Sequence, residues 1–536
     1  MIIPLPSRTA GGADPFELTP ATPLTADPAL SRAAAWLREA LTPATGCPLP
    51  EGTGGIEIRT APGLPPEGYE LTVTAERVLI RAGDPAGAFY GAQSLRQLLD
   101  PAVYRAGRTG KRRWQVAPVT IGDRPAFRWR GCLIDVARHF LPKHELLRYI
   151  DLLAMHKLNV LHLHLTDDQG WRLEIRKYPR LTEVGAWRRE SPVGSVVHGR
   201  FDGRPHGGYY SQDDIREIVA YAADRFVTVV PEIDLPGHTR AAIAAYPELG
   251  NLAEAQPEVG TGWGIQDDVL NVSDAAITFF KDVFDEVLEL FPGEYVCVGG
   301  DEARKGQWRE SLDAKQRMAD LGLRSVEELQ TWFVRQFTDY LIARGRTPLG
   351  WDELLEGGVP AGTTVAAWRG EECAALAVRA GHDVVVSPFT GTYLDFRQSE
   401  LADEPVPIGS VTSLRDVHAF DPLPAGLAGA ERERVLGAQA ALWTEHIDSP
   451  RLLDYMAFPR LAAFAEAVWS GRQDFDGFTR RLAVHEKRLE ALGVEFRREG
   501  GPLPWQRRPD APGEPRTRAA IDAQLMAWTA NLRRAP

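Results

Sequence analysis

The 536-residue chain has few cysteines and no excess of positive charge. Its four cysteines are widely spaced and lie mostly in apolar segments: Cys47, Cys132, Cys297 and Cys373. This spacing fits neither a disulfide framework nor a cysteine-based zinc site, so we expect four reduced core thiols. The formal net charge of −12 argues against nucleic acid and anionic membranes as partners, because no basic excess is available to neutralise phosphate groups.

Long apolar runs are also missing. No stretch of the sequence approaches the length that a membrane span needs. The segment from Met1 to Arg8 lacks the charged start and apolar core of a signal peptide. We therefore expect a cytoplasmic protein without a membrane partner. The composition, 44% hydrophobic and 25% charged, is that of a globular protein and not of a disordered one.

The sequence pattern divides the chain into three parts. Residues 1–122 predict a small α/β accessory domain, with alternating strands at Ile56–Arg59 and Tyr69–Val73 and a helix capped by Asp84. Residues 123–498 form the main domain. Residues 499–536 are rich in Pro and Arg and then helical from Arg518 to Leu532. We interpret this C-terminal tail as a surface appendage.

In the main domain, eight short apolar runs alternate with helical segments. The runs are Gly131–Val136, Val160–Leu165, Val227–Val230, Tyr295–Val298, Thr347–Gly350, Thr364–Ala367, Asp383–Ser387 and Leu436–Leu442. Parallel strands joined by crossover helices show this alternation. The fold class is therefore predicted to be α/β, a (β/α)8 TIM barrel preceded by the small α/β domain.

Polar and aromatic residues stand where the predicted strands end, on the face that carries the chemistry of such barrels. They include Arg138, Asp167, His238, Asp301, Glu302, Trp351, Trp368, Tyr393, Asp395, Trp443 and Glu445. Packing alone does not explain polar or Trp residues at eight consecutive ends. Carboxylates beside Trp suit a sugar, whose ring faces stack on aromatics while its hydroxyls bond to charged side chains.

Asp301 and Glu302 are adjacent at the end of the fourth run, after two glycines. Neighbouring carboxylates repel each other and lose hydration when they are partly buried, so their presence there favours proton chemistry. The alternative is a solvated acidic pair at the start of a helix, where the helix dipole favours negative charge.

Seven segments, taken in order, resemble family 20 glycoside hydrolases, the β-N-acetylhexosaminidases. The resemblance runs from about Arg128 to Trp469, and its segments are Asp135–Phe140, His162–Arg172, Pro231–His238, Gly299–Glu302, Gly350–Glu353, Thr392–Asp395 and Leu442–Glu445. It implies a retaining exo-glycosidase that removes terminal non-reducing β-N-acetylhexosamine from an oligosaccharide or glycoconjugate. In such enzymes the substrate's own 2-acetamido group attacks, through an oxazolinium intermediate, without metal or cofactor.

The resemblance also implies a role for each residue. Glu302 would be the general acid and base, and Asp301 would hold the acetamido N–H. Tyr393 would donate to the acetamido carbonyl, and a box of Trp351, Trp368 and Trp443 would enclose that group. Arg138, Asp395 and Glu445 would bind the sugar hydroxyls, while Asp167 and His238 would support Glu302.

Two other functions stay open at this point. His162 and His164 lie on one face of a strand, as zinc ligands do in some barrel hydrolases, which would make the protein a metal-dependent enzyme. That alternative needs further His or Lys ligands, and the ends of strands four to six offer carboxylates and Trp instead. A non-catalytic sugar-binding barrel is the second alternative, but such a protein would keep the Trp residues and lose the acid. The sequence does not indicate an oligomeric state.

Overall fold

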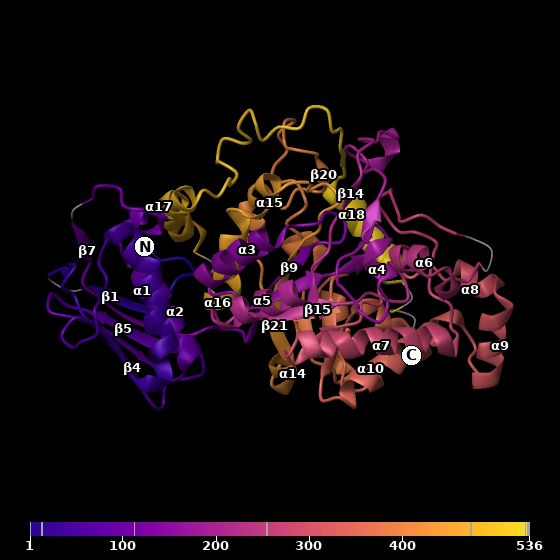
Figure 1. The fold of residues 1–536 in the computed structure, drawn as a ribbon, viewed down its shortest axis with the longest axis horizontal. Helices are drawn as coiled ribbons and strands as arrows, with labels where there is room; N and C mark the ends of the chain where they lie inside the picture. Colours follow the sequence, from indigo (N-terminus) through magenta and orange to yellow (C-terminus); the bar gives the residue numbers. More distant parts are fainter. Residues whose placement is uncertain are drawn as a thin grey trace.

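The protein consists of a closed barrel with a smaller sheet domain beside it (Figure 1). A computed structural model describes residues 2–11, 14–111, 113–252, 256–471, 474–530 and 532. In this part of the chain no helix is both long and apolar enough to cross a lipid bilayer. All four cysteines are buried and free, which confirms the expected reduced core thiols.

The N-terminal domain is a six-stranded sheet covered by two helices. Its strands, in spatial order, are β1 (Arg8–Gly11), β8 (Val119–Asp123), β5 (Tyr69–Val73), β6 (Val78–Ala82), β4 (Ile56–Thr60) and β3 (Leu24–Ala26), and its helices are α1 (Ser31–Thr45) and α2 (Pro85–Leu98). In β5 every second residue is buried, and these side chains face the helices. Asp84 caps α2 as predicted, because its side chain accepts from the Gly87 N–H.

The barrel contains all eight predicted strands. They are β9 (Trp129–Asp135), β10 (Val160–His164), β15 (Thr228–Glu232), β16 (Tyr295–Cys297), β17 (Thr347–Trp351), β18 (Thr364–Ala367), β19 (Val384–Val386) and β21 (Val435–Leu442). Neighbouring strands are parallel, and β21 closes the barrel by pairing with β9. Every residue of β9 and β21 is buried, as expected for strands enclosed on both faces.

Helices pack around the barrel. Those between its strands include α3 (Lys143–Met155), α5 (Gln212–Ala223), α7 (Asp274–Leu290), α10 (Val326–Ile342) and α11 (Glu371–Arg379). After the last strand come α15 (Pro450–Ala457), α16 (Arg460–Ser470) and α17 (Phe475–Leu492). Ser211 and Asp214 form a capping box at the start of α5, which satisfies N–H groups that the helix leaves free. The face at the carboxyl ends of the strands is built by the loops that follow them, and short elements in these loops include α6 (Arg240–Ala245), α12 (Phe389–Thr392) and β20 (Ile408–Gly409).

The C-terminal tail corrects one prediction. It is not a surface appendage: β22 (Glu514–Pro515) pairs with β20, and α18 (Arg518–Trp528) packs at the barrel mouth. The helix also ends four residues earlier than the sequence predicted. Its Ile521 is buried against the aromatic residues that follow the barrel strands.

Candidate active site

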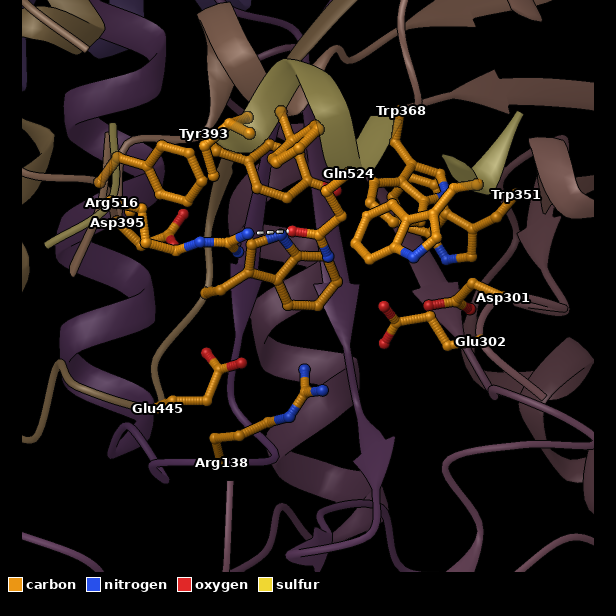
Figure 2. Close-up of a pocket in the computed structure, with 16 residues that line it drawn as sticks. Arg138, Asp301, Glu302, Trp351, Trp368, Tyr393, Asp395, Glu445, Arg516 and Gln524 are labelled. Carbon is orange, nitrogen blue, oxygen red and sulfur yellow. Dashed lines mark hydrogen bonds between the residues drawn. The ribbon is translucent and has the colours of Figure 1, made fainter. Parts of the chain in front are cut away.

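A cavity of about 250 Å³ opens at the carboxyl ends of the barrel strands. Nine of the eleven predicted site residues line it: Arg138, Asp301, Glu302, Trp351, Trp368, Tyr393, Asp395, Trp443 and Glu445. In Figure 2, Arg138 and Glu445 lie together at one side of the cavity, and Asp301 and Glu302 lie beside the Trp residues. The other two predicted residues, Asp167 and His238, are buried and contact this lining from behind.

The turn after β16 places the two adjacent acids. Gly299 and Gly300 have φ of 67° and 102°, a region that glycine adopts without strain. A Cβ on Gly299 would lie 1.7 Å from Asp234 Oδ1, so only glycine fits there. Glu302 itself has φ of 47°, which is unusual for a residue with a side chain. Such local strain is found most often at functional sites.

Asp301 offers an acceptor that the protein leaves free. Its Oδ1 is fully buried and has no hydrogen-bond partner among the described residues. Burial raises the pKa of Asp301 to about 6, and the charges of Glu232 and Glu302 act in the same direction. Burial and the charge of Asp301 raise the pKa of the neighbouring Asp234 well above its usual range. Asp301, which lines the cavity, therefore has a buried carboxylate oxygen without a partner among the described residues.

Glu302 is linked to the barrel interior through His238. His238 Nε2 lies 3.5 Å from Glu302 Oε2, and His238 Nδ1 lies 3.3 Å from Asp167 Oδ1. Burial alone would lower the pKa of His238, but Asp167, Asp168 and Glu302 outweigh it and raise that pKa well above its usual range. The predicted set of Asp167, His238 and Glu302 is thus brought together as a chain of polar contacts.

The three Trp residues and Tyr393 form an aromatic wall. Trp351 and Trp443 have ring centroids 6.1 Å apart, and Trp368 is stacked on Tyr393 at 6.5 Å. Tyr393 and Trp443 are 5.9 Å apart. Four rings from the ends of β17, β18 and β21 and the loop after β19 therefore enclose a space next to Asp301.

Two carboxylates that the sequence analysis did not assign hold this wall in place. Glu232 accepts from Trp351 Nε1 at 2.7 Å, and Glu353 accepts from Trp368 Nε1 at 2.8 Å. Both are acids at predicted strand ends, but their positions in the sequence do not indicate which indole N–H each one accepts from. Their bonds fix the orientation of two rings, because a buried indole N–H needs a partner.

The opposite side of the cavity carries fixed charge for polar contacts. Arg138 Nη2 lies 2.8 Å from Asp167 Oδ2, and its guanidinium lies over the Trp443 ring at 5.2 Å. Burial raises the pKa of Asp395 well above its usual range, with Glu445 adding to the effect. Asp395 Oδ1 is buried and has no partner among the described residues. This side of the cavity therefore also has a free acceptor, to which a sugar hydroxyl group could donate a hydrogen bond.

The histidines of the metal alternative lie inside the barrel. His164 Nδ1 is 2.6 Å from Glu232 Oε2, and His162 Nε2 is 3.2 Å from the same oxygen. Groups such as His164, Glu232 and Asp234 have donor atoms close enough to share a cation. However, His164 already bridges Glu232 and Asp167, whose Oδ2 also meets Arg138. His164 therefore already has a carboxylate partner at each of its two ring nitrogens.

Residues 127–472 match the glycosyl hydrolase family 20 catalytic domain, and residues 1–124 match the second domain of the same family. The chain belongs to glycosyl hydrolase family 20. It is therefore a hydrolase of the β-hexosaminidase family, with the barrel and the preceding domain that the sequence predicted.

Family 20 relatives are similar over most of the chain. A β-hexosaminidase of Porphyromonas gingivalis is 41% identical over 519 residues, which covers 94% of this chain, although the chain spans only 65% of that relative. A β-hexosaminidase of Vibrio furnissii is 36% identical over 81% of this chain and 70% of its own.

Solved structures show the same architecture. The family 20 β-N-acetylhexosaminidase of Streptomyces coelicolor has a TM-score of 0.81 at 36% identity, covering 94% of this chain and 98% of its own. The exo-β-N-acetylglucosaminidase of Vibrio harveyi, in complex with N-acetylglucosamine, has a TM-score of 0.83 at 34% identity, covering 93% and 78%.

Proposed function

We propose that the protein is a retaining exo-β-N-acetylhexosaminidase that works by substrate-assisted catalysis. One observation carries the proposal: Asp301 and Glu302 are adjacent at one strand end, and Asp301 keeps a buried, unpartnered Oδ1 beside the aromatic wall. In most retaining glycosidases two carboxylates flank the scissile bond, about 5 Å apart, and one of them is the nucleophile. Here one carboxylate is placed to orient a group of the substrate and the other to handle the proton.

In the first step, the acetamido N–H of the bound sugar donates to Asp301, which orients the amide. The amide carbonyl oxygen attacks the anomeric carbon while Glu302 gives its proton to the departing glycosidic oxygen. The C–O bond to the leaving group breaks, and a bicyclic oxazolinium ion forms. The Asp301 charge stabilises the positive charge that develops on the amide.

In the second step, water attacks the anomeric carbon and Glu302 takes a proton from it. The ring of the intermediate opens and the acetamido group is restored. Two displacements at one carbon give retention of configuration. The aromatic wall of Trp351, Trp368 and Trp443 would exclude water from the amide, and Tyr393 would donate to its carbonyl oxygen.

The shape of the cavity supports an exo mode of action. Its volume of about 250 Å³ lies below the usual 300–1,000 Å³ of small-molecule sites, and Arg138 and Glu445 line one side of it. These residues and Asp395 would bind the hydroxyls of one terminal sugar. The bound N-acetylglucosamine in the Vibrio harveyi enzyme supports an amino sugar as the ligand. We propose an amino-sugar oligosaccharide or glycoconjugate as substrate.

We also propose a cytoplasmic location, because the four cysteines are free and buried. Cell fractionation tests this location.

Comparison of two aryl β-glycosides that differ only at C2 tests this function. The 2-acetamido glycoside should be hydrolysed, and proton NMR should show the β-anomer as the first product. The 2-hydroxyl analogue should scarcely react, because it lacks the positioned attacking oxygen. Similar rates on both, or an α-anomer as first product, would contradict the proposal. A rate that is lost with a chelator and restored by zinc would instead favour the metal-dependent alternative.

A further inference from the structure

The C-terminal tail is attached to the catalytic face at several points. The backbone of Ser195 donates to Pro512 O at 2.8 Å, and the backbone of Arg516 donates to Gly409 O at 2.9 Å. Arg369 Nη1 donates to Trp528 O at 3.2 Å. The loops after strands β10, β18 and β19 thus all hold the tail, and its position does not depend on a single contact.

One face of α18 lies against the aromatic wall. Ile521, Leu525 and Trp528 follow helical spacing and pack in the same cluster as Trp351 and Trp368. The Trp528 ring is 5.3 Å from Trp368 and 6.1 Å from Phe389. The side chain of Gln524 points into the cavity and accepts from Arg516 Nη2 at 2.5 Å (Figure 2). A helix more than 150 residues after β18 therefore completes the pocket.

A second cavity of about 210 Å³ adjoins the first. The two cavities share three lining residues, Glu302, Trp368 and Trp528. The second cavity is further lined by Lys305, Gln330 and Arg369 and by the carboxylates of Glu353 and Glu356, while Arg138, Asp395 and Glu445 line only the first. Glu302 therefore stands between the side that carries the hydroxyl-binding groups and a separate space on its other side.

The proposed reaction suggests a function for the second cavity. If Glu302 protonates the glycosidic oxygen, as the proposed function requires, the leaving group must lie on the Glu302 side. In the proposed function Arg138 and Glu445 would hold the opposite end of the terminal sugar, so the leaving group would point away from them. The second cavity is where it would enter.

We propose that Trp528 is the aromatic platform of the leaving-group subsite and that this subsite takes a pyranose ring, such as a second amino sugar. The ring would stack its apolar face on the indole, and Lys305 would donate to its hydroxyls. Trp528 is then a specificity-determining residue, supplied by the tail and not by a barrel loop. The inference rests on the proposed function of Glu302.

The test compares two substrates in Trp528→Ala, Trp528→Phe and the wild type. One substrate is the β-linked disaccharide of N-acetylglucosamine. The other is the methyl β-glycoside of the single sugar N-acetylglucosamine, whose leaving group is methanol and has no ring. The ratio of kcat/KM for disaccharide over methyl glycoside should fall about tenfold in Trp528→Ala, the upper range for an aromatic contact. Trp528→Phe should recover most of that ratio.

Met526→Ala is the matched control, because Met526 lies on the exposed face of the same helix. Its ratio should equal that of the wild type. Equal losses on both substrates in Trp528→Ala would show that Trp528 acts only by supporting Trp368, and unchanged kcat/KM on both substrates would exclude the subsite; either result overturns the proposal. If the wild type hydrolysed neither substrate, the proposed function itself would fall, and this inference with it.

Discussion

Two regions of the molecule each contain a buried aspartate, and the two carboxylates differ in whether their oxygens have hydrogen-bond partners. At the junction of the two domains, Asp123 accepts from Tyr69 at 2.7 Å, Lys157 at 2.9 Å and Trp469 at 3.0 Å. At the barrel mouth, Asp301 is left with a buried oxygen that lacks a partner among the described residues. The junction satisfies its buried charge, and the mouth does not.

The pKa values follow from this difference. Burial alone would raise the pKa of Asp123, but Lys157 and the hydrogen bonds outweigh burial and lower it. For Asp301, burial dominates and raises the pKa to about 6. An unsatisfied buried acceptor costs about 1–3 kcal/mol, and the residue that carries this one lines the cavity, where a ligand could complete it. The comparison therefore separates a structural carboxylate from a functional one.

The largest expected effect is at the mouth. Glu302→Gln should lower kcat about 10²–10⁴-fold on the disaccharide, because that leaving group needs a proton and general acid help is typically worth this much. The loss should be smaller on an activated aryl glycoside, whose leaving group departs without a proton. Steady-state kinetics on both substrates check this, and equal losses would mean that Glu302 is not the acid.

At the junction, Lys157→Met should destabilise the fold by about 3–5 kcal/mol, because it leaves Asp123 buried without its cation. The matched control is Lys111→Met, which breaks an exposed ion pair with Asp100 and should cost at most about 1 kcal/mol. Unfolding monitored by circular dichroism measures both. The folded Lys157→Met protein should keep its kcat, and a large loss of kcat would remove the distinction between the two regions.

A smaller effect concerns pH. Because the pKa of Asp301 is raised from its usual 3.8 to about 6, this carboxylate takes up a proton as the pH falls through 6. The charge that would stabilise the oxazolinium ion is then lost, so kcat/KM should fall about tenfold per pH unit below that point. A profile that stays flat down to pH 5 would contradict this assignment. The pH profile of the residual kcat/KM of Asp301→Asn should not show this decrease below pH 6.

Much of this could be predicted from the sequence, because the decisive signals are local. Strands enclosed in a barrel are short apolar runs, and residues such as Trp351 and Glu302 lie at or shortly after their ends. The position of α18 could not be predicted, since its amphipathic face shows that it packs but not on what. Trp528 contacts Trp368 only because the tertiary fold brings these distant segments of the chain together. Likewise, the bond between Glu232 and Trp351 joins strands β15 and β17, which are not neighbours in the barrel.

The most direct test measures the affinity of a thiazoline analogue of the bicyclic intermediate for the wild type and for Asp301→Asn. Calorimetry should show tight binding to the wild type, as for transition-state-like ligands, and a loss on the order of 10²-fold in the variant. Asn would lack the charge and could present an N–H to the ligand's own N–H. Unchanged affinity, or a fluoro-sugar ester found on Asp301 or Glu302 by peptide mass spectrometry, would contradict substrate-assisted catalysis at this site.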